Sequence, residues 1–298
     1  MNLQRIGMLG YGEVGKTFAA GLLPSVAAVS AWDLKFDQPA LRDTERGHAV
    51  AAGVRATQSV ADACSDADLL ISAVTASSTL AVAREAAAHI RVGSIFLDLN
   101  SASPGTKQEA AALIDGAGGV YVEAGVMTSV PPYGIRVPML LGGIQAPALA
   151  EILVGWGMDA QVASDQLGVA SAIKMCRSVM IKGLEALVIE SYTTARAYGV
   201  EDQVIPTLQE TFPRIDWQQS GAYFFSRVAQ HGQRRAEEMR ESARTVQEGG
   251  FAPIMAGAIA DKQQWVSDQA RAGVFKGLGK DARWQDYADR LLAARKAN

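Results

Sequence analysis

Short apolar runs alternate with amphipathic, alanine-rich stretches over the first half of the chain. The apolar runs predict strands, and the longer stretches between them predict helices. Strands that alternate with helices of about ten or more residues are typical of βαβ units, which build a parallel sheet. The predicted strands are Arg5–Leu9, Ala28–Trp32, Asp68–Val74, Ser94–Leu97 and Val120–Glu123, and the predicted helices are Val14–Leu23, Pro39–Ala52, Ser77–His89 and Pro104–Ile114. Val137–Gly142 and Asp159–Ala163 are expected to add edge strands around a helix near Pro147–Trp156.

After about Ser164 the strand signals stop. The segment Leu167–Tyr198 keeps a helical period without a proline, and Gly199 follows it in the manner of a C-cap. Such a helix is about 45 Å long, and helices of that length usually lie at the centre of a helical domain. Further helices are expected at Glu201–Phe212, Ser220–Gln247, Pro253–Ala272 and Ala282–Arg295. The pattern predicts an α/β domain with a doubly wound sheet over residues 1–164, followed by an all-α domain over residues 165–298.

Length, charge and cysteine content narrow the class of protein. A chain of 298 residues is about twice the common domain size, which agrees with two domains. The net charge of -3 argues against a nucleic-acid partner, and no apolar run is long enough to predict a membrane span. The N-terminus leads straight into a glycine-rich motif and leaves no room for a signal peptide. Two cysteines without a CxxC pair and three scattered histidines predict neither a disulfide framework nor a metal site, so we expect a cytoplasmic protein.

A glycine-rich motif follows the first predicted strand and opens the first predicted helix. Gly10, Tyr11, Gly12, Glu13, Val14 and Gly15 fit G-x-G-x-x-G. The first glycine permits a tight turn, the second lets a pyrophosphate approach the backbone, and the third allows close helix–strand packing. The helix N-terminus offers N–H groups and a positive dipole end to the phosphates. The context favours a Rossmann-type dinucleotide site; a ligand-free turn and an S-adenosylmethionine site are the alternatives.

An acidic residue at the end of the second predicted strand indicates which dinucleotide binds. Asp33 lies 23 positions after Gly10, where a carboxylate can accept hydrogen bonds from the ribose hydroxyls and repel a 2′-phosphate. We therefore expect NAD, with NADP as the alternative because Lys35 follows closely. A helix-capping role is the other interpretation of Asp33. Val74 and Thr75, at the end of the fourth predicted strand, are expected to flank the nicotinamide.

Two later segments carry a family resemblance. Residues 98–104 read DLNSASP, and residues 168–174 read GVASAIK. The first resembles the D-x-S-T-x-x-P substrate loop, and the second the G-x-x-x-x-x-K catalytic segment, of the β-hydroxyacid dehydrogenases, the family of 3-hydroxyisobutyrate and 6-phosphogluconate dehydrogenases. The stretch from Lys174 to Leu187 resembles a subgroup of putative phosphogluconate-dehydrogenase-like NAD-binding proteins that have their own C-terminal helical domain. The resemblance implies hydride transfer between NAD and a 3-hydroxy acid, with Lys174 as the catalytic lysine.

The sequence also departs from the family pattern. The family continues its lysine helix as K-x-x-N-N, where this chain has Arg177 and Ser178. The family's D-A-P-V-S-G-G segment becomes EAGVMTS over residues 123–129. Met127 cannot supply the hydroxyl that the family places on a substrate carboxylate, although Thr128 and Ser129 could. The family's usual substrates are therefore in question, and a related small anionic substrate is expected.

The oxidation of an alcohol requires a base for the hydroxyl proton as well as a hydride acceptor. A lysine serves as that base when burial or a neighbouring cation lowers its pKa. Arg177 and Ser178 follow Lys174 by three and four residues, so they share its helix face, and Arg177 could also bind an anionic substrate. The alternative is that Lys174 is an ordinary surface lysine. Lys182 is the rival base, although its spacing to Glu185 favours a structural salt bridge.

Other polar groups complete the predicted substrate site. Asn100 and Ser101 follow the fifth strand, where open α/β sheets bind ligands, and they could hydrogen-bond a carboxylate or the reacting oxygen. Ser103 is better explained as the N-cap of the helix that Pro104 begins. His231, Arg234 and Arg235 on a later helix either contact an anionic substrate or form a solvated face; the second is the commoner case.

The preferred interpretation is an NAD-linked oxidation of a 3-hydroxy carboxylic acid, or the reverse reduction. An imine or ketoacid reductase on the same scaffold is the alternative among enzymes, and a non-catalytic NAD-binding redox sensor is the alternative outside them. A long apolar helix in a domain of roughly 130 residues leaves apolar surface to bury, so a homodimer or higher homo-oligomer is expected.

Overall fold

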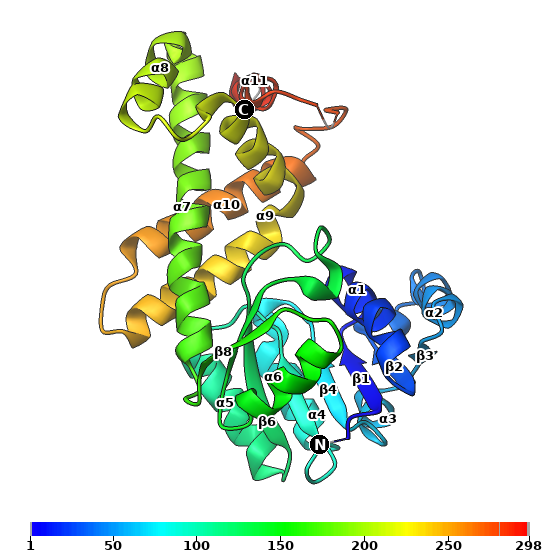
Figure 1. The fold of residues 1–298 in the computed structure, drawn as a ribbon. Coiled ribbons are helices and arrows are strands. Elements are labelled where there is room, and N and C mark those ends of the chain that lie inside the picture. Colours follow the sequence, from blue (N-terminus) through cyan, green and yellow to red (C-terminus); the bar gives the residue numbers. More distant parts are fainter. Residues whose placement is uncertain (1, 280, 297–298) are drawn as a thin grey trace. The chain divides into compact units, whose positions relative to one another are not determined.

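The computed structural model describes residues 2–279 and 281–296. The chain divides between Met175 and Cys176 into two compact units, and the division falls inside one long helix. The first unit is an α/β unit and the second is all helical (Figure 1). This arrangement confirms the fold class expected from the alternation of strands and helices followed by helices alone.

The first unit is built on one eight-stranded sheet with the order β3-β2-β1-β4-β5-β6-β7-β8. The strands are β1 (Arg5–Leu9), β2 (Ala28–Trp32), β3 (Arg55–Ala56), β4 (Leu69–Ser72), β5 (Ile95–Asp98), β6 (Val120–Val126), β7 (Met139–Gly142) and β8 (Ala160–Ser164). The strands from β3 to β6 are parallel, whereas β7 runs antiparallel to β6 and parallel to β8. On the side of the sheet that contains β7, the edge strand is β8 alone. The expectation that β7 is also an edge strand is wrong, because β7 pairs on both sides.

Both faces of the sheet are covered by helices, as the alternation of side chains along each strand requires. Six helices belong to this layer arrangement: α1 (Glu13–Leu22), α2 (Arg42–Ala51), α3 (Val60–Cys64), α4 (Thr79–Ala87), α5 (Pro104–Gly116) and α6 (Ala146–Gly155). Ile6 and Met8 share one apolar core with side chains of α1 and α6. Leu70 and Phe96, on the other face, share a second core with side chains of α3, α4 and α5. The result is a doubly wound sheet with two buried faces.

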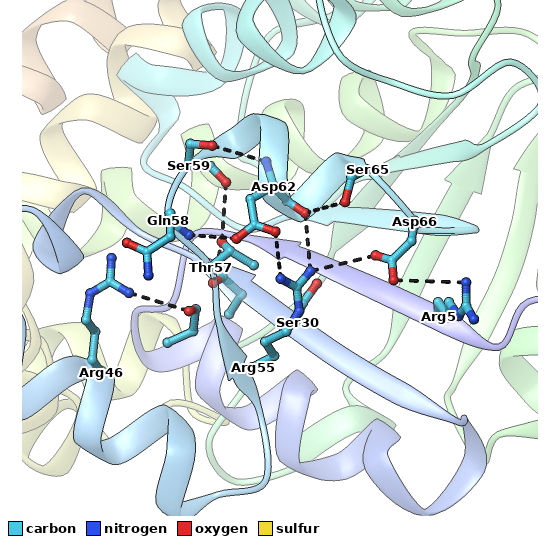
Figure 2. A network of polar contacts seen from close by, with 12 residues as sticks. Arg5, Ser30, Arg46, Arg55, Thr57, Gln58, Ser59, Asp62, Ser65 and Asp66 are labelled. Carbon is cyan, nitrogen blue, oxygen red and sulfur yellow. Dashed lines mark hydrogen bonds and ion pairs between the residues drawn. The ribbon is translucent and has the colours of Figure 1, made fainter.

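The edge strand β3 and the short helix α3 escaped the sequence analysis because neither has room for a periodic pattern. A network of polar side chains links β3 to α3 at this edge (Figure 2). The carboxylate of Asp62 accepts a hydrogen bond from Arg55 at 2.6 Å and one from the backbone N–H of Gln58 at 2.9 Å. The hydrogen bond from Arg55 is the main reason that the pKa of Asp62 lies below its ordinary value. Ser59 caps α3 through the N–H of Asp62. The residues that follow the two-residue strand β3 therefore help to hold it in place.

The described residues of the helical unit form five helices. These are α7 (Val169–Tyr198), which begins in the first unit, α8 (Glu201–Thr211), α9 (Trp217–Glu248), α10 (Ile254–Arg271) and α11 (Trp284–Lys296). The long helix ends where the sequence predicts, since Gly199 has a φ of 68°. Tyr192, Trp217, Phe225 and Trp284 are buried in the main apolar core. Among the described residues, no helix is both long and apolar enough to cross a membrane.

Candidate active site

One row of paired residues crosses the parallel part of the sheet and marks its carboxyl edge. Leu9 pairs with Trp32 on one side and with Ser72 on the other; Ser72 pairs with Asp98, and Asp98 with Glu123. In a parallel sheet, residues that follow such a row all project from the same edge. The glycine-rich loop, Asp33, the loop after β4 and the substrate loop follow it directly. The first unit therefore gathers these predicted site residues at the edge where open α/β sheets bind ligands.

The glycine-rich loop has the geometry of a phosphate cradle. Gly10 has a φ of 99°, and a Cβ at this position would lie 2.5 Å from the carbonyl oxygen of Ala73. A Cβ at Gly15 would collide with the carbonyl oxygen of Gly10. At Gly12, by contrast, no atom of the described chain would lie within 4 Å of a Cβ. The first and third glycines are thus required by the fold, and the second leaves open space in front of the N-terminus of α1.

Tyr11 faces the protein interior. Its buried ring packs against Phe36 and His48, and its hydroxyl lies 3.3 Å from Nδ1 of His48. Burial raises the pKa of Tyr11, with a smaller contribution from Glu45. Glu45 also pairs with Lys16 at 2.6 Å, which joins α2 to α1. The side chain of Tyr11 therefore anchors the loop, so its contribution to a cofactor site is the backbone. Glu13 and Val14 lie in the first turn of α1, with Glu13 exposed.

Asp33 both caps and supports the loop. Its Oδ2 accepts a hydrogen bond from the N–H of Tyr11 at 2.6 Å, and its Oδ1 accepts one from the N–H of Lys35 at 2.9 Å. The capping role that the sequence left open is therefore present, at a short 3-10 helix over Leu34–Phe36. A carboxylate has about four acceptor sites, so both oxygens retain capacity for ribose hydroxyls. The two roles of Asp33 are compatible.

The substrate loop after β5 is fixed by a buried polar network. Asp98 and Lys107 are fully buried and lie 3.0 Å apart between Oδ1 and Nζ. Tyr121 donates to Oδ2 of Asp98 at 2.6 Å, and the N–H of Asn100 donates to Oδ1 at 2.8 Å. Burial, followed by the charge of Asp98, raises the pKa of Tyr121 well above its ordinary value, which keeps its hydroxyl a donor. The network holds the backbone of the loop in place.

The side chain of Asn100 is directed at the neighbouring loop. Its Nδ2 donates to Oγ of Ser72 at 2.9 Å, and its Oδ1 accepts from the N–H of Val74 at 2.7 Å. Asn100 thus joins the substrate loop to the predicted nicotinamide loop. Ser101, which is partly exposed, is the better placed of the two for a ligand. Thr75 is exposed, with its hydroxyl 3.2 Å from that of Ser77. Ser103 caps α5 through the N–H of Thr106, as the sequence predicts.

Lys174 lies in the part of α7 that belongs to the first unit. The helix approaches β6 closely there, because a Cβ at Gly125 would lie 3.4 Å from the Cβ of Lys174 and 3.0 Å from the carbonyl oxygen of Ala170. Gly125 is two residues beyond Glu123, so Lys174 is placed beyond the row that marks the carboxyl edge. Thr128, exposed, and Ser129, partly exposed, follow the end of β6.

Farther along α7, the rival lysine has a different partner from the one predicted. Nζ of Lys182 lies 2.8 Å from Oε2 of Glu238 and donates to Oγ of Ser178 at 3.1 Å. Glu185, which the sequence suggested as its partner, instead forms a two-pronged pair with Arg235. The prediction of a Lys182–Glu185 bridge is wrong, because both side chains face oppositely charged groups of α9. Lys182 still has a structural role. The hydroxyl of Ser178 is buried and accepts the hydrogen bond from Lys182.

The other charged residues of the helical unit that the sequence suggested for the site differ in how exposed their side chains are. Arg177 is exposed on α7. Arg234 is partly exposed, and its Nε lies 3.7 Å from Oε1 of Glu238. Arg235 is buried against Glu185 and so is not part of a solvated face. His231 lies one turn before them on α9. The cluster is therefore divided: Arg235 belongs to the fold of the unit, and Arg234 is half-buried beside Glu238. Among the described residues, no group of three His, Cys, Asp or Glu side chains could hold a metal ion.

Comparison with known proteins adds to this geometry. Residues 5–131 match the family described as the NAD binding domain of 6-phosphogluconate dehydrogenase, and residues 195–266 match a domain of unknown function (DUF1932). A conserved hypothetical protein from Sinorhizobium meliloti 1021 is 36% identical, with a TM-score of 0.75 over 98% of this chain and 97% of its own. A conserved protein of unknown function, described as structurally similar to 3-hydroxyacid dehydrogenases, is 32% identical, with a TM-score of 0.67 over 90% of this chain and 98% of its own. This chain belongs to the β-hydroxyacid dehydrogenase family.

Members of the wider fold group have known activities. The Mycobacterium tuberculosis 3-hydroxyisobutyrate dehydrogenase, solved with L-serine, is 17% identical, with a TM-score of 0.71 over 97% of this chain and 99% of its own. An imine reductase from Myxococcus stipitatus in complex with NADP+ is 17% identical, with a TM-score of 0.54 over the same shares. These two likenesses show the fold, and the match of residues 5–131 shows that the first unit of this β-hydroxyacid dehydrogenase family member is an NAD-binding domain. The geometry of the three glycines in the loop fits a dinucleotide independently of these comparisons.

Sequence reasoning missed the supporting residues of the site. It named Asp98 and Glu123 only as letters of family motifs, and it gave Lys107 and Gly125 no role. The one signal in the sequence was their position next to strand ends, which does not tell a supporting residue from a surface one.

Proposed function

We propose that this protein transfers a hydride between NAD and the hydroxyl-bearing carbon of a small 3-hydroxy carboxylic acid, with Lys174 as the general acid/base. The observation that carries the proposal is the close approach of Lys174 to Gly125, at the edge of the sheet that also bears the glycine-rich loop and the substrate loop. A lysine at this edge is within the region where ligands of open α/β sheets bind.

Each group has a separate task in the proposed reaction. The nicotinamide of the bound cofactor supplies the hydride acceptor. Nζ of Lys174, in its neutral form, takes the hydroxyl proton as the carbonyl forms, and its ammonium returns the proton in the reverse reaction. The hydroxyls of Ser101, Thr128 and Ser129 are the proposed donors to the substrate carboxylate. Arg177, exposed on the helix of Lys174, is the proposed cation for an anionic substrate.

A substrate panel tests the proposal directly. Purified protein is incubated with NAD+ or NADP+ and a set of hydroxy acids that includes 3-hydroxyisobutyrate, 3-hydroxypropionate, glycerate and L-serine, and NADH or NADPH formation is followed by absorbance. Turnover of a 3-hydroxy acid supports the proposal. The reverse direction is followed with NADH or NADPH and a set of imines and ketoacids. Reduction of an imine or a ketoacid without oxidation of any hydroxy acid of the panel would replace the proposal with a reductase. Tight NADH binding without turnover of any panel member would favour a redox sensor.

The cofactor preference is a separate prediction. NADH should bind at least tenfold more tightly than NADPH, about 1.4 kcal/mol, because Asp33 retains acceptor capacity for ribose hydroxyls and repels a 2′-phosphate. Fluorescence titration with both reduced cofactors measures the ratio. Asp33→Ser should narrow it, and Asp37→Ser, an exposed carboxylate four residues on, is the control that should not. Equal affinities of the unaltered protein for the two cofactors would contradict the prediction.

A homodimer is proposed for the assembly. Met180 and Leu187 lie seven residues apart on one face of α7 and are 74% and 56% exposed, which is unusual for large apolar side chains on a central helix. Light scattering at micromolar concentration should give twice the monomer mass. Leu187→Glu should shift the protein toward the monomer, whereas Val92→Glu, at a still more exposed apolar position in the first unit, should not. A monomeric unaltered protein would refute the proposal.

A further inference from the structure

A buried carboxylate of the sheet caps the N-terminus of α7. Glu123 is fully buried. Its Oε1 accepts hydrogen bonds from the N–H groups of Gly168 at 2.7 Å and Ala170 at 3.1 Å, and its Oε2 accepts one from Ser171 at 3.3 Å. These N–H groups belong to the end of a helix where no intrahelical partner exists. Glu123 is thus an N-cap supplied from 45 residues earlier in the chain.

The neighbouring strand leaves room for this carboxylate. Gly142 of β7 pairs with Glu123 in the sheet, and a Cβ at Gly142 would collide with Oε1 of Glu123. Gly142 does not have a positive φ, so its backbone conformation would accept alanine. Only the carboxylate therefore explains why a side chain is excluded here. A side chain at position 142 would displace the capping carboxylate from this position.

The same face of β6 also touches the lysine. Glu123 and Gly125 are two residues apart, so they face the same side of the strand. Glu123 holds the first turn of α7, and Gly125 lies against Ala170 and Lys174, one helical turn apart. A shift or rotation of α7 on β6 would therefore move Lys174 directly.

We infer that Glu123 is a positioning residue for Lys174: its carboxylate fixes the height and rotation of α7 on β6, and so the place of the lysine ammonium. The inference rests on the proposed function, since it matters to catalysis only if Lys174 carries the proton. The physical reason for an effect on rate is that a misplacement of about 1 Å can cost up to about 100-fold in turnover. Glu123 takes no part in the chemistry itself.

Two substitutions disturb the cap in different ways. Glu123→Gln keeps the volume of the side chain but replaces one acceptor oxygen by a donor group, which cannot accept from the backbone N–H groups. Gly142→Ala keeps the charge and displaces the carboxylate. The controls are Glu151→Gln, an exposed glutamate of α6, and Gly155→Ala, a helical glycine where a Cβ would meet no atom of the described chain within 4 Å.

The measurement is kcat counted per NADH-binding site, with the hydroxy acid of the panel that is turned over fastest. Both variants should lose about tenfold or more in kcat with NADH affinity unchanged, while the controls stay within about twofold of the unaltered protein. In a Lys174→Ala background, Glu123→Gln should cause no further loss, because a residue that acts only through the lysine has nothing left to position. If Glu123→Gln does not fold, Gly142→Ala gives the same comparison.

The outcomes separate this inference from the proposed function. Full kcat in both Glu123→Gln and Gly142→Ala, alongside an inactive Lys174→Ala, would overturn the positioning role alone. A further loss in the Lys174→Ala background would also overturn it, since Glu123 would then act on the fold and not through the lysine. An active Lys174→Ala protein, or no turnover of any panel member, would overturn the proposed function and this inference with it.

Discussion

Lys174→Ala should lower turnover by roughly 100-fold or more while leaving NADH affinity nearly unchanged. Loss of a general acid/base typically costs 10²–10⁴-fold, or about 3 to 5 kcal/mol of transition-state stabilisation. The proposed cofactor contacts lie on other segments, namely the loop from Gly10 to Gly15 and Asp33. Steady-state kinetics on the panel substrate and fluorescence titration with NADH give the two quantities. An effect on kcat without an effect on cofactor binding is the expected signature.

Two further lysine variants make this test specific. Lys174→Arg should not restore turnover, because a guanidinium stays protonated at any working pH and cannot accept the proton. Lys182→Met is the control on the same helix. It breaks the pair with Glu238 and should lower the melting temperature, yet it should retain most of kcat. An inactive but folded Lys182→Met protein together with an active Lys174→Ala protein would show that the active site lies at the turn of Lys182 and that the placement at Lys174 is wrong.

Lys107→Met should destabilise the protein by about 3–5 kcal/mol, the typical cost of leaving one member of a buried ion pair without its partner. Both Lys107 and Asp98 are fully buried, so no solvent screens the charge that remains. The carboxylate of Asp98 would keep Tyr121 and the N–H of Asn100 as donors, but no cation. Urea unfolding followed by tryptophan fluorescence measures the loss. Turnover should fall as well, because the same network holds the substrate loop.

Two comparisons identify the buried charge as the cause. Asp98→Asn combined with Lys107→Met should be less destabilising than Lys107→Met alone, since the unpaired charge is then removed. Lys16→Met breaks a pair of similar length, 2.6 Å to Glu45, that is partly exposed, and it should cost no more than about 1 kcal/mol. A Lys107→Met protein that is as stable as Lys16→Met would contradict the assignment.

Local patterns were sufficient for most of the fold. The strands β1 and β2 and the end of α7 at Gly199 lie where the sequence predicts, because short apolar runs, a helical period and a left-handed glycine are properties of short segments. The strand β3 was missed because a two-residue strand held by polar side chains has no period to detect. The position of β7 inside the sheet was also missed, since strand order is decided by pairing partners far apart in the chain.

Partners of charged side chains were the least predictable part of the site. Helical spacing favoured Glu185 as the partner of Lys182, because residues three apart on a helix are neighbours. The tertiary structure brings Glu238 and Arg235 of α9 to these two residues instead. Each of the two residues thus pairs with an oppositely charged side chain of another helix. A pattern within one helix contains no information about such partners.

The sequence by itself determined the fold class, the nucleotide-binding loop and the family, because each depends on residues close together in the chain or on their order along it. Only the tertiary structure decided that Asn100 joins two loops, that Lys107 neutralises Asp98, and that Glu123 caps the helix of Lys174. The physical reason is that a buried polar group must find its partner wherever the fold supplies one, and the fold supplied these from segments up to 48 residues away.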